Sequence, residues 1–141
     1  MDLFKQNIIT LSSQLENLPS NEEKYSFIMS LAGEVFSIPH PVPEMFQKVR
    51  GCQSEMYISQ DENGTIEIYS DALLSKGLAA LLLRCLSGLA PLDIVQCSFE
   101  DLQILNLSQI LSPGRLNGFE SLFSSIKLLI INNYRKNPSF T

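Results

Sequence analysis

The chain has 141 residues, with 15 acidic and 10 basic side chains and a net charge of −5. This length is typical of one domain, so we expect a single domain over residues 1–141. A nucleic-acid surface needs an excess of Lys and Arg, so nucleic acid is not an expected partner. The chain holds one His, which excludes poly-His metal sites and disfavours catalytic triads.

Cysteine use and hydropathy predict the compartment. The three Cys residues contain no CxxC pair, and the first ten residues lack a signal-length apolar run. The most apolar stretch, residues 72–90, carries Lys76 and Arg84 within it. Charge at mid-span is costly, so we expect a buried helix here and no membrane span. These observations predict a cytoplasmic protein with reduced thiols.

Apolar residues recur at helical spacing in the first part of the chain. They predict one amphipathic helix over residues 3–18 and a second whose apolar stripe runs from Tyr25 to Phe36. Between them, Ser20 and Glu23 have the spacing of a capping box. Three prolines within residues 39–43 then predict an extended loop over residues 37–48.

A hairpin follows the proline-rich loop. Residues 53–59 and 65–69 resemble strands, and the turn between them ends in Asn63-Gly64, a strong hairpin pattern. A third strand could begin at Val49-Arg50. Because helices precede and follow the hairpin, the predicted class is α+β with a small antiparallel sheet.

The second half of the chain is predicted to be helical. Ser70 or Asp71 should cap the apolar helix over residues 72–90, and Pro91 should open a short helix ending near Val95. Residues 100–111 form a weaker helical stretch, which Ser112-Pro113-Gly114 interrupts. The last helix carries its apolar residues on one face: Phe119, Leu122, Phe123, Ile126, Leu129, Ile130 and Tyr134.

The tetrapeptide Gly51-Cys52-Gln53-Ser54 is the strongest candidate site, at the junction of the proline-rich loop and the first strand. Gly51 permits a sharp turn that presents the next side chain. Arg50 favours the thiolate of Cys52 by charge. The alternative is an inert Cys packed at the start of a strand.

The other reactive side chains have simpler interpretations. Cys85 lies in the apolar helix and Cys97 near Phe99, so both are expected to be packed and inert. His40 is expected in a solvated loop, and Arg115 either holds an anion or forms a surface ion pair. The sequence contains no phosphate-binding glycine motif and predicts no cofactor.

Four patches, in order, resemble the SufE sulfur-acceptor proteins of iron–sulfur cluster assembly. They extend from about residue 21 to the last helix. Their members are Glu22-Glu23-Lys24-Tyr25, Val49-Arg50-Gly51-Cys52-Gln53-Ser54 with Met56-Tyr57-Ile58, Ser70-Asp71-Ala72 with Lys76-Gly77-Leu78, and Leu111-Ser112-Pro113-Gly114-Arg115 with Gly118.

The chain departs from the family pattern in two places. Met56-Tyr57 stands where the family usually has Val-Trp, which keeps an aromatic residue at the site. Pro113-Gly114-Arg115 stands where it usually has Pro-Ser-Arg, which removes a hydroxyl group and loosens the backbone.

The resemblance implies a sulfur carrier and not a stand-alone enzyme. Cys52 would take persulfide sulfur from a pyridoxal-phosphate cysteine desulfurase, raise its turnover, and pass the sulfur to an iron–sulfur cluster scaffold. The implied fold is a curved antiparallel sheet with helices packed to one side, shared with U-type scaffold proteins. The residues expected to support Cys52 are Arg50, Gly51, Gln53, Ser54, Asp71 and Arg115.

Two alternatives remain open from the sequence. A U-type scaffold would bind a nascent cluster itself, which requires Cys52, Cys85 and Cys97 to converge. An inert adaptor would dock on the desulfurase without accepting sulfur. For a carrier, we expect the resting sulfur of Cys52 to lie in an apolar pocket formed by its own loop and neighbouring helices, with Met45, Phe46 and Met56 nearby in sequence.

Overall fold

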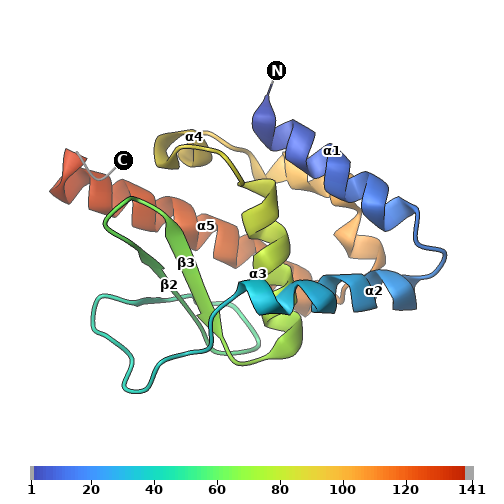
Figure 1. The fold of residues 1–141 in the computed structure, drawn as a ribbon, viewed down its shortest axis with the longest axis horizontal. Coiled ribbons are helices and arrows are strands. Elements are labelled where there is room, and N and C mark those ends of the chain that lie inside the picture. The colour runs from blue at the N-terminus through green and yellow to red at the C-terminus, as the bar shows by residue number, and fades with distance from the viewer. Residues whose placement is uncertain (1, 139–141) are drawn as a thin grey trace.

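The computed structural model describes residues 2–138, and its fold is α+β, as predicted (Figure 1). The strands are β1 (Gln47–Lys48), β2 (Met56–Gln60) and β3 (Ile66–Ser70). The α-helices are α1 (Leu3–Glu16), α2 (Asn21–Ser30), α3 (Leu73–Cys85), α4 (Pro91–Val95) and α5 (Pro113–Lys136). Three 3-10 segments complete the described part of the chain: η1 (Leu31–Glu34), η2 (Phe99–Leu105) and η3 (Leu107–Gln109).

The described strands form a three-stranded antiparallel sheet in the order β1-β2-β3. Tyr57 in the central strand pairs with Lys48 on one side and Tyr69 on the other. The third strand lies at Gln47–Lys48, two residues before the predicted start at Val49. Val49 still donates its N–H to the carbonyl of Met56 at 2.9 Å, so the edge pairing ends where the Cys52 loop begins.

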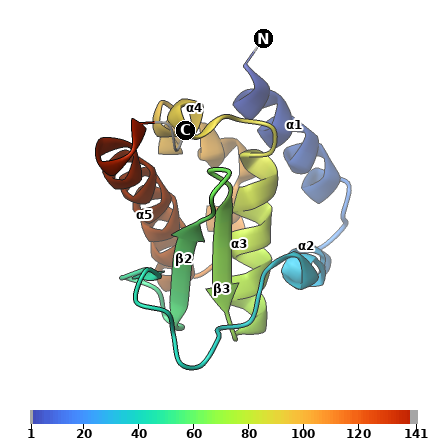
Figure 2. The ribbon, with the colours of Figure 1, turned by 60° about the vertical axis from the view of Figure 1, so that its left-hand side comes forward.

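Helices pack against one face of the sheet, which confirms the predicted arrangement. Ile58 and Ile68 are fully buried, and α3 contacts β3 while α5 contacts β2. In both views α3 lies between the hairpin and the pair α1 and α2 (Figures 1 and 2). The apolar run that we expected to be a buried helix is therefore the centre of the core, where Ala79, Leu81 and Leu82 are buried.

Several helix ends follow from local chemistry. Ser20 caps α2 as predicted, because its Oγ accepts the N–H of Glu23 at 3.1 Å. The helix over residues 72–90 was predicted too long: it ends at Cys85, and Gly88 then adopts a φ of +82° that reverses the chain. Its N-cap is Ala72, and Asp71 instead accepts the N–H of Ile38 at 3.0 Å.

Two further expectations were wrong. Pro113 and Gly114 do not interrupt a helix but open α5, with Ser112 as N-cap accepting the N–H of Arg115 at 3.3 Å. Proline suits this position because its missing N–H would be unpaired in a first turn anyway. Phe36 does not lie on a helical stripe. It is 53% exposed and bridges to β3, accepting the N–H of Ser70 at 2.9 Å.

Among the helices of residues 2–138, none has the length and apolar character needed to cross a membrane.

Helices α2 and α3 cross at Gly77, where their backbones meet. A Cβ added at Gly77 would lie 2.3 Å from the carbonyl oxygen of Ile28. Backbone atoms cannot give way cheaply, so Gly77→Ala should lower the free energy of unfolding by about 1–3 kcal/mol. Urea denaturation measures the change. Gly33→Ala is the matched control, since its Cβ would meet no described atom within 4 Å.

Candidate functional site

The loop over residues 49–55 lies along the first turns of α5. Three successive loop residues each face a small residue of the helix, and the added-Cβ distances show how close they come. A Cβ at Gly114 would lie 2.3 Å from Nε2 of Gln53, and one at Gly118 would lie 3.6 Å from Cα of Cys52. Gly51 has a φ of +83°, and a Cβ added to it would lie 2.7 Å from Oγ of Ser121. An added Cβ would therefore overlap the facing side chain at Gly51 and at Gly114, and would make ordinary contact with Cys52 at Gly118.

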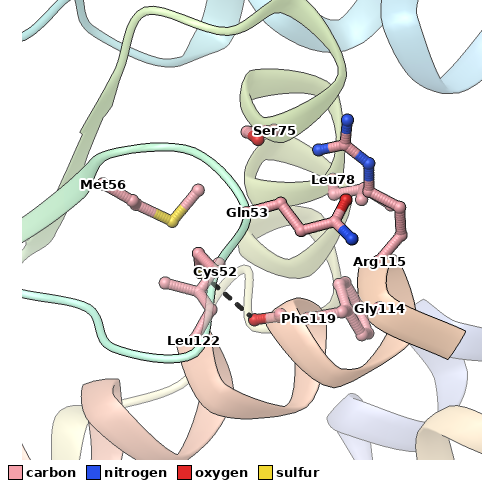
Figure 3. Close-up of a pocket in the computed structure, with 10 residues that line it drawn as sticks. Cys52, Gln53, Met56, Ser75, Leu78, Gly114, Arg115, Phe119 and Leu122 are labelled. Atoms are coloured by element: carbon pink, nitrogen blue, oxygen red, sulfur yellow. Dashed lines mark hydrogen bonds between the residues drawn. The ribbon is translucent and has the colours of Figure 1, made fainter.

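Cys52 is half-buried in a pocket between this loop, α3 and α5 (Figure 3). Its Sγ donates to the carbonyl oxygen of Gly118 at 3.6 Å. The cavity volume is about 20 Å³, close to what one water molecule needs. The pocket is lined by Cys52, Gln53, Met56, Ser75, Leu78, Gly114, Arg115, Gly118, Phe119 and Leu122. The expected resting pocket for the sulfur is thus present.

The cations near Cys52 are placed differently from the prediction. Burial raises the pKa of the Cys52 thiol. Arg50, which we expected to favour the thiolate, lines a separate surface depression with Asn117, Glu120 and Ser121. Arg115 is the Arg that lines the Cys52 pocket. In the resting structure desolvation therefore sets the direction of the pKa shift of Cys52. The arginine that shares its pocket belongs to α5.

The ends of the loop are anchored. Ser75 of α3 donates its hydroxyl to Oγ of Ser54 at 3.0 Å, and Ser70 donates to the carbonyl of Glu55 at 3.1 Å. Before β1, the ring of Phe46 packs on Tyr69 with centroids 4.4 Å apart. Residues 50–53 lie between these fixed points.

Other expected residues lie outside the pocket. Phe46 packs on the sheet, as described, and Met45 is 78% exposed, so of the three expected apolar residues Met56 lines the pocket. Asp71 holds the proline-rich loop through Ile38, and its carboxylate lies 3.8 Å from Nε2 of His40. Both side chains are largely exposed.

The three thiols occupy separate environments. Cys85 is buried in α3, and burial raises its pKa to about 12. Cys97 is half-buried with its Sγ donating to the carbonyl of Asp93 at 3.4 Å, and burial raises its pKa to about 11. Within residues 2–138, no three His, Cys, Asp or Glu side chains are grouped to hold a metal ion.

The sequence predicts that neighbouring helices help to form the pocket, but it did not identify which of their residues line it. Ser75 and Leu78 come from α3, and Gly118, Phe119 and Leu122 from α5. One pattern could have indicated it: Gly114 and Gly118 are four residues apart, so they share one face of a helix. Two glycines on one face mark a place where another backbone approaches closely.

Fold and pocket together define a small α+β domain with one half-buried thiol on a short loop. A structure from Thermus thermophilus, described as a hypothetical protein, shares this fold with a TM-score of 0.69 and 22% identity. The match covers 92% of this chain and 94% of that one. The family model SufE, described as an Fe-S metabolism associated domain, matches residues 9–130. The chain therefore belongs to the SufE family, which is associated with iron–sulfur metabolism.

Named relatives agree with this assignment. A SufE-like protein of Arabidopsis thaliana, named as chloroplastic and mitochondrial, is 30% identical over 88% of this chain and 33% of its own length. The cysteine desulfuration protein SufE of Plasmodium falciparum is 27% identical over 88% of this chain and 52% of its own length. An uncharacterised SufE-like protein of Synechocystis is 41% identical over 57% of this chain and 52% of its own length. The chain thus spans about half or less of the length of these relatives.

The raised pKa of Cys52 predicts a pH profile for alkylation. Because burial disfavours the thiolate, the rate with iodoacetamide should rise with pH and reach its midpoint above 9.0, the ordinary value. Mass spectrometry after quenching measures the rate at each thiol. Cys52 should react before Cys97 and Cys85, whose pKa values are about 11 and about 12.

Unfolding in urea is the control for this profile. It should bring all three midpoints together near the ordinary value, because burial is lost. A native midpoint for Cys52 at or below that value would contradict the burial argument.

Proposed function

We propose that this protein is a sulfur carrier that accepts persulfide sulfur on Cys52 from a cysteine desulfurase. The observation that carries the proposal is the half-buried Cys52 thiol on a glycine-containing loop that is anchored at both ends. Membership of the SufE family and the printed name of the Plasmodium relative support the desulfurase as partner. In this proposal the protein forms no product alone and stimulates its partner by removing sulfur.

The transfer step is an exchange between thiols. The Cys52 thiolate attacks the outer sulfur of the persulfide on the desulfurase cysteine, in line with the sulfur–sulfur bond. A new sulfur–sulfur bond forms on Cys52 as the old bond breaks, and the desulfurase cysteine leaves as a thiolate. Electrons balance without an added oxidant or reductant. The proton released by Cys52 balances the proton that the leaving thiolate takes up.

The resting pocket would serve as protection. Reactive thiols and persulfides are oxidised when they are exposed, so a carrier benefits from covering Cys52 between encounters. Docking would swing residues 50–53 outward and bring the sulfur to the partner, a local motion of few residues. Exposure would also bring the pKa of Cys52 back toward its ordinary value, which raises the reactive thiolate fraction.

The scaffold alternative is less well supported. A cluster held by this chain would need several ligands at one place. Cys85 lies in the core of α3, and Cys97 lines a surface depression with Asp2 and Asp101. Within residues 2–138, Cys52 is the thiol that lines the pocket. We therefore propose that the sulfur passes to a separate iron–sulfur scaffold.

The compartment is part of the proposal. We propose the cytoplasm for this chain, because its three cysteines are free in the structure and disulfides are rare in that compartment. The Arabidopsis relative is named as chloroplastic and mitochondrial. Fluorescence microscopy of a tagged chain would decide between the cytoplasm and an organelle.

The acceptor role of Cys52 is tested by substitution. Cys52→Ser should abolish sulfur acceptance from a desulfurase supplied with cysteine, while the fold remains, because the change is one atom at a loop. Intact-protein mass spectrometry detects the added sulfur. Cys97→Ser is the matched control and should still accept it. Sulfur retained on the Cys52→Ser protein would overturn the assignment.

Asp71 is expected to act on docking and not on bond making, because it lies outside the pocket on an exposed surface. Asp71→Asn removes the charge but leaves an oxygen to accept the N–H of Ile38. It should weaken affinity for the desulfurase by about two- to fivefold, as exposed charges do. Calorimetry measures this affinity.

Two controls accompany the Asp71 experiment. Asp61→Asn makes the same change at the hairpin turn, where Asp61 accepts the N–H groups of Asn63 and Thr65. The alkylation rate of Cys52 should be unchanged in both variants. Equal loss of affinity and of thiol reactivity in Asp71→Asn would argue against a docking role.

A further inference from the structure

Gln53 lies at the mouth of the Cys52 pocket. Its side chain lines the pocket and is at the same time exposed to solvent, so it forms part of the boundary between them. It extends from the loop toward Gly114 and Arg115, across the space between α3 and α5 (Figure 3). The neighbouring residue Cys52 points to the inner side, toward the carbonyl of Gly118.

The place that the Gln53 carboxamide occupies exists because residue 114 has no side chain. A Cβ built on Gly114 would lie 2.3 Å from Nε2 and 3.2 Å from Cδ of Gln53. Real Cβ atoms do not come so close to another heavy atom. Any other residue at position 114 therefore conflicts with the observed position of this carboxamide.

The conflict would be resolved by moving Gln53. The atoms in contact are the far end of a flexible side chain, and Gln53 is an exposed residue. Movement into solvent costs little, in contrast to Gly77, where an added Cβ would meet backbone. A side chain at 114 is thus compatible with the fold but incompatible with the carboxamide lying over the pocket.

We propose that the Gln53 carboxamide is a lid on the Cys52 pocket, and that Gly114 is the positioning residue that lets the lid close. The inference deepens the proposed function, on which it rests: the lid covers the thiol that would carry sulfur. Because Gln53 is an exposed residue, a docking partner can contact it directly and displace the lid before the loop moves.

The consequence for the thiol is specific. Lifting the lid opens the pocket to solvent and reagents while Cys52 keeps its place on the loop. Burial of the sulfur then decreases, and with it the desolvation that raises the pKa of Cys52. Both effects act in the same direction, toward faster reaction with a small alkylating reagent.

The test is alkylation of the isolated protein by iodoacetamide at neutral pH, followed at Cys52 by mass spectrometry. Gly114→Ala should raise the rate by about threefold or more and lower the midpoint of its pH profile. Gln53→Ala, which removes the lid itself, should give an equal rise. The double variant should react no faster than Gln53→Ala, because both changes remove the same lid.

Two control variants distinguish the effect of displacing the lid from the effect of replacing a helical glycine in general. Gly33→Ala adds a methyl group that meets no described atom within 4 Å, so it should leave the rate unchanged. Gly118→Ala would place its Cβ 3.7 Å from Sγ of Cys52 in ordinary contact, which covers the thiol further and should slow the reaction. Circular dichroism and thermal unfolding verify that each variant is folded.

Three outcomes would overturn the proposal. They are an unchanged rate in Gln53→Ala, additive effects in the double variant, and a Gly118→Ala protein that reacts as fast as Gly114→Ala. The first applies even if Gly114→Ala fails to fold. Since none of these measurements uses a desulfurase, failure of the lid is distinguishable from failure of Cys52 to accept sulfur.

Discussion

The close approach of residues 51–53 to the first turns of α5 is the contact on which the site depends. The fit is close: an added Cβ would overlap Gln53 if placed on Gly114 and Ser121 if placed on Gly51, and it would touch Cys52 if placed on Gly118. From this approach follow the half-buried state of Cys52, the raised pKa of its thiol, and the presence of Arg115 at the pocket. The core behind it, centred on α3, supplies a rigid wall against which the loop is held.

Local patterns predicted most of the elements. The N-cap at Ser20, the hairpin around Asn63-Gly64 and the periodic face of α5 each depend on neighbours within a few residues, and each appears in the structure. The edge strand at Gln47–Lys48 was misplaced because two residues carry no periodicity. Pro113 was misinterpreted because proline both ends helices and begins them, and only the preceding N-cap decides between the two.

The candidate site was predictable in part for the same reason. Gly51, Cys52, Gln53 and Ser54 are consecutive in the sequence, so their pattern could be recognised and Cys52 identified as the candidate thiol. Which arginine lies near that thiol depends on the side of the loop that faces α5, a contact between residues more than sixty positions apart in the sequence. Spacing along the chain therefore favoured Arg50, whereas packing places Arg115 at the pocket. The lining residues of α3 and α5 could not be identified until the two helices were placed side by side.

The hydrogen bond from Cys52 to the Gly118 carbonyl has a further consequence. A thiol can donate to a carbonyl oxygen, but a thiolate has no hydrogen to donate and would be repelled by the partial negative charge of that oxygen. The contact that holds the sulfur at rest therefore exists for one protonation state alone. Deprotonation therefore does two things at once: it makes Cys52 a nucleophile, and it removes the hydrogen bond between its sulfur and α5.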